Sequence, residues 1–130
     1  MPESDLFDTG IEIRRDALGA DYVDANLANS DDFMMAFQRA VTELVWGYAW
    51  SRPRLDRKTR FMTNIAMLTA LGRSEELTIY TRGARAAGVT IDEIKEVLIQ
   101  ATVYCGSPAG RQAFIAVHEA LEGEGAEQAR

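Results

Sequence analysis

Arginines are the side chains of this sequence best suited to bind a small acid. A guanidinium holds a carboxylate through two parallel hydrogen bonds, which fix its orientation as well as its charge. Arginine supplies most of the positive charge of the 130-residue chain, whose formal net charge is −6. This negative balance argues against nucleic acid as a partner but leaves room for a local basic pocket. The arginines placed where a pocket is expected are Arg57, Arg60, Arg82 and Arg111.

Tyr80, Glu76 and Arg60 are the candidates for catalysis. A free tyrosine has a pKa of about 10, so Tyr80 is better suited to donate a hydrogen bond than to accept a proton. Glu76 can carry a proton, but an acid near a helix N-terminus also stabilises the helix without any catalytic role. For Arg60 and Arg57 the alternative to a functional role is a surface ion pair.

Metal and thiol chemistry has little support in the sequence. The only cysteine, Cys105, excludes an intramolecular disulfide and a thiolate zinc site. The only histidine, His118, cannot form a histidine cluster for a transition metal. We expect Cys105 to be a small buried residue and His118, next to Glu119, to be solvated. We therefore predict neither a metal nor a cofactor.

Composition and patterning favour a single all-α domain over residues 1–130. Hydrophobic residues make up 47% and charged residues 26% of the chain, a balance typical of globular proteins. The apolar runs are too short to span a bilayer and the acidic N-terminus lacks the features of a secretory signal, so a cytoplasmic location is expected. Strand signals are almost absent. The pattern predicts a compact bundle of about six helices, with a frayed tail at residues 123–130.

Capping residues and glycines divide the chain into these helices. The first is expected over about residues 4–18, the second from 30 to near 50, and four more follow. Thr90 and Glu93 form a capping box, in which each side chain accepts a hydrogen bond from the backbone of the other. The expected N-terminal caps are Ser30, Asp56, Ser74, Thr90 and Ser107, and the expected glycine stops are Gly19, Gly72 and Gly88.

The helices and their joints together resemble the carboxymuconolactone decarboxylase family along nearly the whole chain. No single fragment is specific, but the order and spacing of many fragments make a chance similarity improbable. The matching stretches include Phe7-Asp8-Thr9-Gly10, Trp46-Gly47, Trp50-Ser51-Arg52-Pro53, Leu55-Asp56-Arg57-Lys58-Thr59-Arg60, Gly88-Val89-Thr90 and Tyr104-Cys105-Gly106.

The resemblance implies a helical protomer assembled into a ring, commonly a hexamer built as a trimer of dimers, so a homo-oligomeric trimer or hexamer is expected. It also implies that 4-carboxymuconolactone loses carbon dioxide to give an enol-lactone, in the breakdown of aromatic acids. Peroxidase-like relatives carry a Cys-x-x-Cys-x-x-x-His motif where this chain has Arg73, Glu76 and Tyr80. Without those cysteines, disulfide-relay peroxidase chemistry is excluded.

The implied decarboxylation needs no metal or cofactor in principle, because the electrons left behind spread onto the lactone carbonyl. An enzyme for it needs a cationic grip on carboxylates, a hydrogen-bond donor for the developing oxyanion, and an acid that delivers a proton. The arginines suit the first role and Tyr80 suits the second.

Three positions depart from the family pattern. Tyr80 replaces the family histidine, Tyr48 replaces an acid after Trp-Gly, and Arg111 replaces a small or amide residue. With Arg57 and Arg82, the residues Trp46, Tyr48 and Arg111 are our candidates for substrate binding. Trp46 and Trp50, four residues apart, are also typical of a core or a subunit interface.

The sequence leaves two alternative functions open. The first is a decarboxylase or related lyase that acts on a carboxylated lactone. The second is a divergent descendant that binds or transforms a different small acid, or that has lost catalysis. The arginines favour the first function, whereas the missing histidine favours the second.

Overall fold

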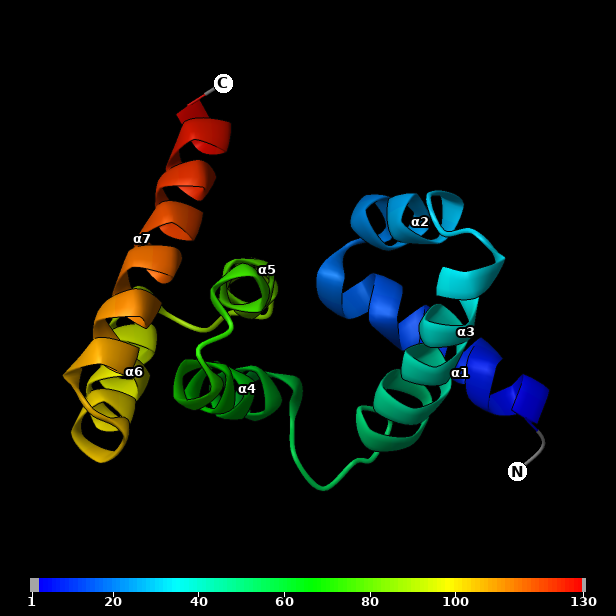
Figure 1. The fold of residues 1–130 in the computed structure, drawn as a ribbon, viewed down its shortest axis with the longest axis horizontal. Coiled ribbons are helices and arrows are strands. Elements are labelled where there is room, and N and C mark those ends of the chain that lie inside the picture. The colour runs from blue at the N-terminus through cyan, green and yellow to red at the C-terminus, as the bar shows by residue number, and fades with distance from the viewer. Residues whose placement is uncertain (1–2, 130) are drawn as a thin grey trace. The chain divides into compact units, whose positions relative to one another are not determined.

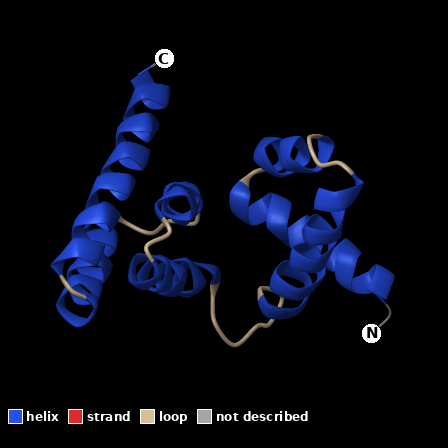
Figure 2. Cartoon of the chain, viewed as in Figure 1, coloured by secondary structure: helices blue, strands red, loops and turns tan. Residues whose placement is uncertain are grey.

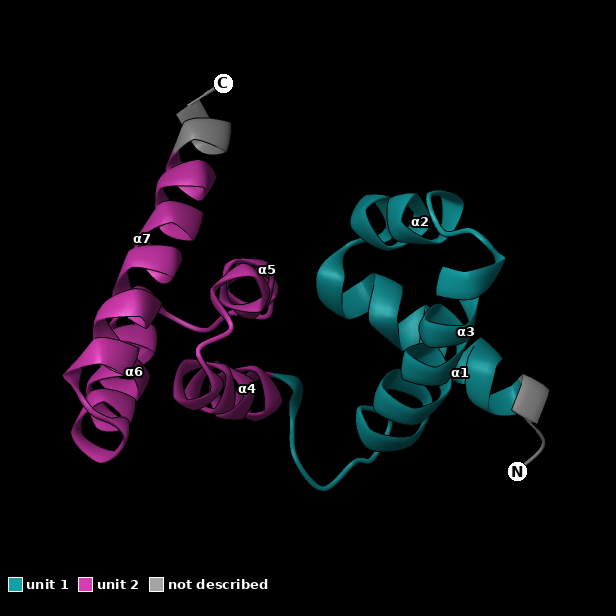
Figure 3. Cartoon of the chain, viewed as in Figure 1, with its two compact units in different colours: residues 1–57 teal, residues 58–130 magenta. Residues whose placement is uncertain are grey.

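The computed structural model describes residues 3–129, and all regular structure in that range is helical (Figure 2). The chain forms two compact units, residues 1–57 and residues 58–130 (Figures 1 and 3). The all-α prediction is confirmed, with seven α-helices and one π-helix in the described range instead of about six helices. None of these helices is both long and apolar enough to cross a membrane.

The first unit contains α1 (Glu3–Leu18), α2 (Ala20–Ala28), α3 (Asp32–Val41) and the π-helix η1 (Thr42–Ala49). The helix α2 was not predicted from the sequence. Gly19 has a φ of 96° and ends α1 as expected, but the chain turns there and begins another helix at once. Val23 is the only buried residue of α2, so this short helix has almost no apolar periodicity to reveal it.

The predicted helix from residue 30 to near Trp50 exists, but its second half is a π-helix. In η1 the backbone hydrogen bonds span five residues, as in the bond of 2.9 Å from the Trp50 N–H to the Val45 carbonyl. A π-helical segment is rare and recurs at functional sites. Sequence periodicity cannot distinguish it from an α-helix, because the apolar face is nearly the same.

Two glycines bring the backbones of α1 and η1 together. A Cβ atom on Gly10 would overlap the carbonyl oxygen of Thr42, and one on Gly47 would overlap the carbonyl oxygen of Leu6. Glycine at both positions therefore allows a closer approach than any side chain would permit. Around this approach Ala17, Val23, Trp46 and Trp50 form the buried apolar centre of the unit.

The second unit contains most of α4 (Arg57–Leu71), together with α5 (Ser74–Ala86), α6 (Ile91–Cys105) and α7 (Ser107–Ala129). α7 packs against both α5 and α6 (Figure 1). The core of this unit draws side chains from all four helices, and the largest of them are Phe61, Ile65, Leu77, Ile94 and Leu98. They lie at helical spacing along the sequence, which is why these four helices were predicted with nearly correct bounds.

The helix ends confirm some predicted caps and correct others. The Thr90–Glu93 capping box is present, with bonds of 3.0 Å to the Thr90 hydroxyl and 2.8 Å to the Glu93 carboxylate. The predicted cap at Ser30 is wrong, because Asp31 rather than Ser30 accepts the Met34 N–H. The Ser30 hydroxyl instead donates to the carbonyl of Asn26 at the end of α2.

Ser74 and Ser107 are the first residues of α5 and α7 rather than caps preceding them. The expectation that Cys105 is buried is also wrong, since this residue is exposed at the end of α6. The helix reaches its last turn there, beyond its buried residues Ile94, Leu98 and Ala101. Residues 123–129 are helical and residue 130 lies outside the described range, so the frayed tail stays a prediction.

Candidate active site

The predicted catalytic residues Arg60 and Tyr80 come from helices that meet through Phe61. Phe61 on α4 is fully buried, and the ring of Tyr80 on α5 meets it edge-on, with 6.1 Å between ring centroids and 62° between ring planes. Such an edge-to-face pair holds two rings in a defined orientation. Arg60 directly precedes Phe61 on α4, and both Arg60 and Tyr80 are half-buried. This partial burial suits groups that must reach a substrate while being held in place.

Glu76 lies one helical turn before Tyr80 on α5, so the two residues are on the same side of that helix. The Glu76 side chain is exposed, and it stands in the first turn of α5 together with Glu75. Acids in this place stabilise the positive end of the helix dipole. An exposed carboxylate in this position is open to proton exchange with solvent.

The other two arginines predicted in this unit do not join Tyr80. Arg82 follows Tyr80 by two residues, a spacing that directs two helical side chains to different faces, and it is exposed. Arg111 is exposed on α7. Of the predicted arginines in residues 58–130, only Arg60 is half-buried next to the Phe61–Tyr80 contact.

The first unit carries the predicted substrate-binding residues Trp46, Tyr48 and Arg57. The rings of Trp46 and Trp50 lie 4.6 Å apart between centroids, and only 3% and 7% of these residues are exposed. Both tryptophans are therefore core residues of η1 and its C-terminal cap. Tyr48 is 56% exposed, and the guanidinium of Arg52 lies 5.4 Å from its ring centroid.

Arg57 forms an ion pair with Asp16 of α1, with 2.8 Å between Nη1 and the carboxylate oxygen. This pair borders a surface groove lined by Glu12, Ile13, Arg15, Asp16, Ala20 and Arg57. An exposed ion pair of this kind contributes little to stability, about 0–1 kcal/mol. Arg57 is thus in a surface ion pair, which was the predicted alternative to a functional role.

Arg14 is a buried arginine that the site prediction missed. It is 6% exposed, and its Nη1 donates to the hydroxyl of Thr42 over 3.2 Å. The Thr42 hydroxyl in turn donates to the carbonyl of Gln38 over 2.7 Å. The sequence held a signal for this burial, because Arg14 lies four residues after Gly10 and three before Ala17, both of which are buried.

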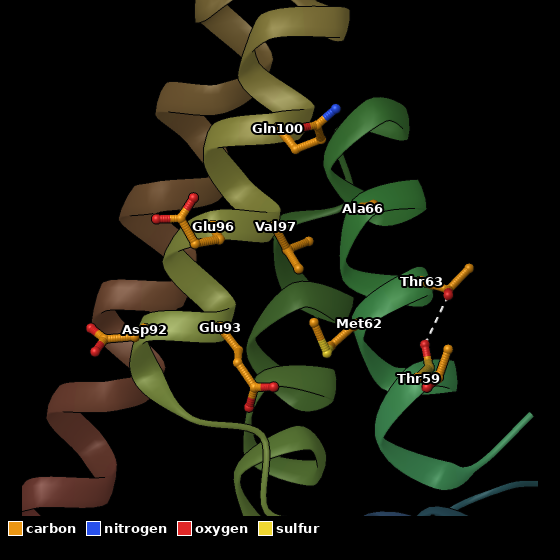
Figure 4. A pocket seen from close by; sticks show the side chains of 9 residues that line it. All are labelled: Thr59, Met62, Thr63, Ala66, Asp92, Glu93, Glu96, Val97 and Gln100. Carbon is orange, nitrogen blue, oxygen red and sulfur yellow. Dashed lines mark hydrogen bonds between the residues drawn. The ribbon is translucent and has the colours of Figure 1, made fainter.

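Two grooves lie on the surface of the second unit, and neither is lined by an arginine in the described chain. The groove between α4 and α6 has a volume of about 640 Å³. Figure 4 shows Met62 and Val97 pointing into it, with the carboxylates of Asp92, Glu93 and Glu96 on its α6 side. Hydrogen bonds from the Thr90 backbone and then its hydroxyl hold the pKa of Glu93 below its ordinary value. This acidic edge disfavours a carboxylate ligand.

The second groove lies between α6 and α7 and has a volume of about 440 Å³. It is mainly apolar, with Lys95 and His118 among its lining residues. His118 pairs with Glu122 over 3.2 Å, and its side chain is 73% exposed, which confirms the prediction that it is solvated. Among residues 3–129, no group of three or more His, Cys, Asp and Glu side chains is arranged to hold a metal ion.

The model of the carboxymuconolactone decarboxylase family matches residues 36–119. The chain belongs to this family. Its residues 36–119 include η1, α4, α5 and α6, and thus both Trp46-Gly47 and the Arg60–Tyr80 region. The family prediction made from the sequence is confirmed.

Two relatives in this family have names that state a reaction. The 4-carboxymuconolactone decarboxylase of Acinetobacter baylyi is 38% identical over 122 residues, which cover 94% of this chain and 91% of that protein. The nitrosuccinic acid decarboxylase of Metarhizium robertsii is 40% identical over 116 residues, which cover 89% of this chain and 81% of that protein. An uncharacterised 15.0 kDa protein of Paracoccus denitrificans is 37% identical over 74 residues, 55% of each chain.

Proposed function

We propose that this member of the carboxymuconolactone decarboxylase family is a carboxy-lyase that removes carbon dioxide from 4-carboxymuconolactone or a similar carboxylated lactone. The observation that carries the proposal is the 38% identity to a 4-carboxymuconolactone decarboxylase over 94% of the chain. A similarity that spans both units and all the predicted site residues supports a shared type of reaction, beyond a shared fold.

In the proposed site Arg60 binds a carboxylate of the substrate and Tyr80 stabilises the charge that develops on the lactone carbonyl. Loss of carbon dioxide breaks one C–C bond, and its electron pair spreads through the adjacent double bond onto the carbonyl oxygen. The hydroxyl of a tyrosine whose ring packs against Phe61 is suited to donate a hydrogen bond to that oxygen. Because the contact with Phe61 holds the ring before the reaction, little reorganisation is needed when the charge forms.

After carbon dioxide leaves, the carbon must receive a proton. Neither Arg60 nor Tyr80 is assigned to deliver it. The resemblance implies a histidine where this chain has Tyr80, and Glu76 is exposed on the same side of α5. We therefore propose that the proton comes from solvent, directly or by way of Glu76. No metal or cofactor is part of this proposal.

The proposed enzyme is a cytoplasmic homo-oligomer, a trimer or a hexamer. Apolar side chains exposed on two helices support self-association: Phe33 on α3 is 84% exposed, and Val103 and Tyr104 on α6 are 74% and 76% exposed. Large apolar groups gathered on a protein surface mark sites of association.

The direct test mixes purified protein with freshly generated 4-carboxymuconolactone and follows its ultraviolet absorbance together with carbon dioxide release. Saturable turnover above the spontaneous rate supports the proposal. Arg60→Gln should then lose most of kcat/KM, while Arg54→Gln, which alters an exposed arginine in the loop before α4, serves as the matched control. No turnover by folded protein would overturn the assignment of this substrate.

A further inference from the structure

The helical segment made of α3 and η1 carries a row of large apolar side chains on one face. Phe33 on α3 is 84% exposed, and Phe37, Leu44 and Tyr48 are each more than half exposed. Successive members of the row are four, seven and four residues apart, which keeps them on one side of the segment. A row of exposed apolar groups marks a site of association, because burying them removes apolar area from water.

A positive charge lies at the C-terminal end of this row. The guanidinium of Arg52 is 5.4 Å from the ring centroid of Tyr48, and Arg52 is exposed in the loop that follows η1. Aromatic residues and arginine are enriched at protein–protein interfaces. Small molecules instead bind in concave pockets, and this row runs along the outside of a helix. We name the four apolar residues and Arg52 the α3–η1 face, and its composition suits a protein partner.

The groove between α4 and α6 has the complementary properties. Met62 from α4 and Val97 from α6 point into it and are half-buried, so its floor is apolar (Figure 4). The carboxylates of Asp92, Glu93 and Glu96 lie along its α6 side. The groove thus combines an apolar floor with a negative edge, whereas the α3–η1 face combines an apolar row with a positive end.

The negative charge at the edge of the groove is only partly balanced by nearby lysines. The Lys58 ammonium lies 3.4 Å from the carboxylate of Glu93. The Lys95 ammonium lies 3.5 Å from the carboxylate of Asp92. In the part of the chain that the structure describes, Glu96 takes part in no ion pair, and it is exposed. An arginine brought to this edge therefore meets a carboxylate that has no cation beside it.

We propose that the α3–η1 face of one copy of the chain docks into the α4–α6 groove of a second copy, with Arg52 near the carboxylates on the α6 side. This pairing rests on the proposed homo-oligomer and specifies which surfaces join its subunits. Face and groove are different surfaces, so the contact is heterologous. Each copy then uses its face toward one neighbour and its groove toward another.

The two kinds of contact have different tasks. Burial of the apolar row against the floor of the groove supplies most of the free energy of association. The charges fix the orientation of the face in the groove and exclude wrong pairings. Effects of charge substitutions should therefore shrink in about 1 M salt, where the Debye length is about 3 Å. Effects of substitutions in the apolar row should persist there.

The experiment measures the mass of the full chain and its variants by light scattering coupled to size exclusion, with circular dichroism to confirm that each variant is folded. Glu96→Arg disables the groove, because it sets a cation against Arg52 of the neighbouring copy. Phe33→Ser with Phe37→Ser disables the face. Each variant alone should give smaller species than the unchanged protein. Glu119→Arg makes the same charge change at an exposed position of α7 outside the groove, and it should leave the mass unchanged.

Mixing the two disabled variants tests the heterologous contact directly. The groove variant keeps an intact face and the face variant keeps an intact groove, so one contact can still form between them. An equimolar mixture should contain a larger species that neither variant forms alone. Native mass spectrometry should find both variants in it in equal number. A mixture that keeps the masses of its separate components would overturn the proposal.

Reversal of the charges tests the proposed orientation. Arg52→Glu should weaken association, and Arg52→Glu combined with Glu96→Arg in one chain should restore it, because the attraction forms again with its charges exchanged. A combined variant that associates as weakly as either single variant would overturn the placement of Arg52 at this edge of the groove.

The remaining outcomes separate this pairing from the proposed function. If the disabled variants keep the mass of the unchanged protein, these surfaces do not join copies and the pairing fails, while the homo-oligomer stands. If the unchanged protein is a single copy at every concentration, the pairing and the homo-oligomer both fail. Decarboxylation is measured separately, so its presence or absence decides the proposed reaction in either case.

Discussion

The ring of Tyr80 on α5 meets the ring of Phe61 on α4 edge-on, at 6.1 Å between centroids. Phe61 is completely buried, so it provides a fixed wall against which the half-buried tyrosine is positioned. The contact with Phe61 is made by the tyrosine ring, and the hydroxyl is a separate group of the same side chain. The hydroxyl and the ring contact can therefore be removed by separate substitutions, one at Tyr80 and one at Phe61.

Tyr80→Phe removes the hydroxyl and keeps the ring contact with Phe61. If the hydroxyl stabilises the developing anion, kcat should fall by about 10²–10³-fold, the usual loss for one oxyanion donor. The variant should remain folded, because the ring contact with Phe61 is retained. Steady-state kinetics with the accepted substrate and a thermal melt check both parts. Unchanged kcat would remove Tyr80 from the mechanism.

Phe61→Ala should destabilise the protein by about 3–5 kcal/mol, because it deletes a fully buried aromatic ring and leaves a cavity. Phe61→Leu keeps most of the volume and should cost much less, but it removes the edge contact with Tyr80. Urea unfolding measures the loss of stability in each variant. We expect Phe61→Leu to remain folded and to show a lower kcat, since Tyr80 is then poorly positioned. If its kcat equals that of the unchanged protein, the contact is purely structural.

The helices of the second unit were predictable because their buried residues recur at helical spacing. The Thr90–Glu93 capping box is a purely local pattern of residue types, and it was found at the predicted place. The family match has a similar basis, since many weak fragments in a fixed order are jointly specific. Features that depend on residues close together along the chain could thus be predicted from the sequence.

Features set by tertiary packing were not predictable in the same way. The backbone of η1 approaches α1 closely at Gly10 and Gly47, and nothing in the local pattern specifies this approach or the π-helical form of η1. Likewise, the candidate arginines look alike in the sequence. In the structure they differ: Arg60 is half-buried, Arg111 is exposed, and Arg57 forms an ion pair with Asp16.

Gly47→Ala should destabilise the protein by about 1–3 kcal/mol, because the new methyl group would overlap the Leu6 carbonyl oxygen and force α1 and η1 apart. Gly123→Ala on α7 is the matched control, since a Cβ atom there meets nothing within 4 Å. Alanine is a better helix former than glycine, so this control should be neutral or stabilising by up to about 1 kcal/mol. Urea unfolding of both variants tests the pair. Equal effects would show that the close backbone approach is unimportant.

Glu93→Gln should destabilise α6 in a manner that depends on pH. The pKa of Glu93 is lowered from its ordinary value of 4.5, first by the hydrogen bond from the Thr90 backbone. Its contribution to stability is therefore fully present above pH 4.5 and is lost as the pH falls through the lowered value of the folded state. The difference in unfolding free energy between the two proteins should be largest at neutral pH and shrink on acidification. A difference that grows at acid pH would contradict this assignment.

Phe33→Ser with Phe37→Ser should shift the protein toward smaller species if α3 forms part of a subunit interface. The two phenylalanines are four residues apart on one face of α3, and they are 84% and 56% exposed. Because neither side chain is buried within the protomer, their removal should cost little stability while it removes apolar area from an interface. Light scattering coupled to size exclusion gives the mass of each species. Leu71→Ser on α4, where the leucine is 66% exposed, is the matched change on another surface. Dissociation caused by Leu71→Ser but not by the α3 changes would move the interface away from α3.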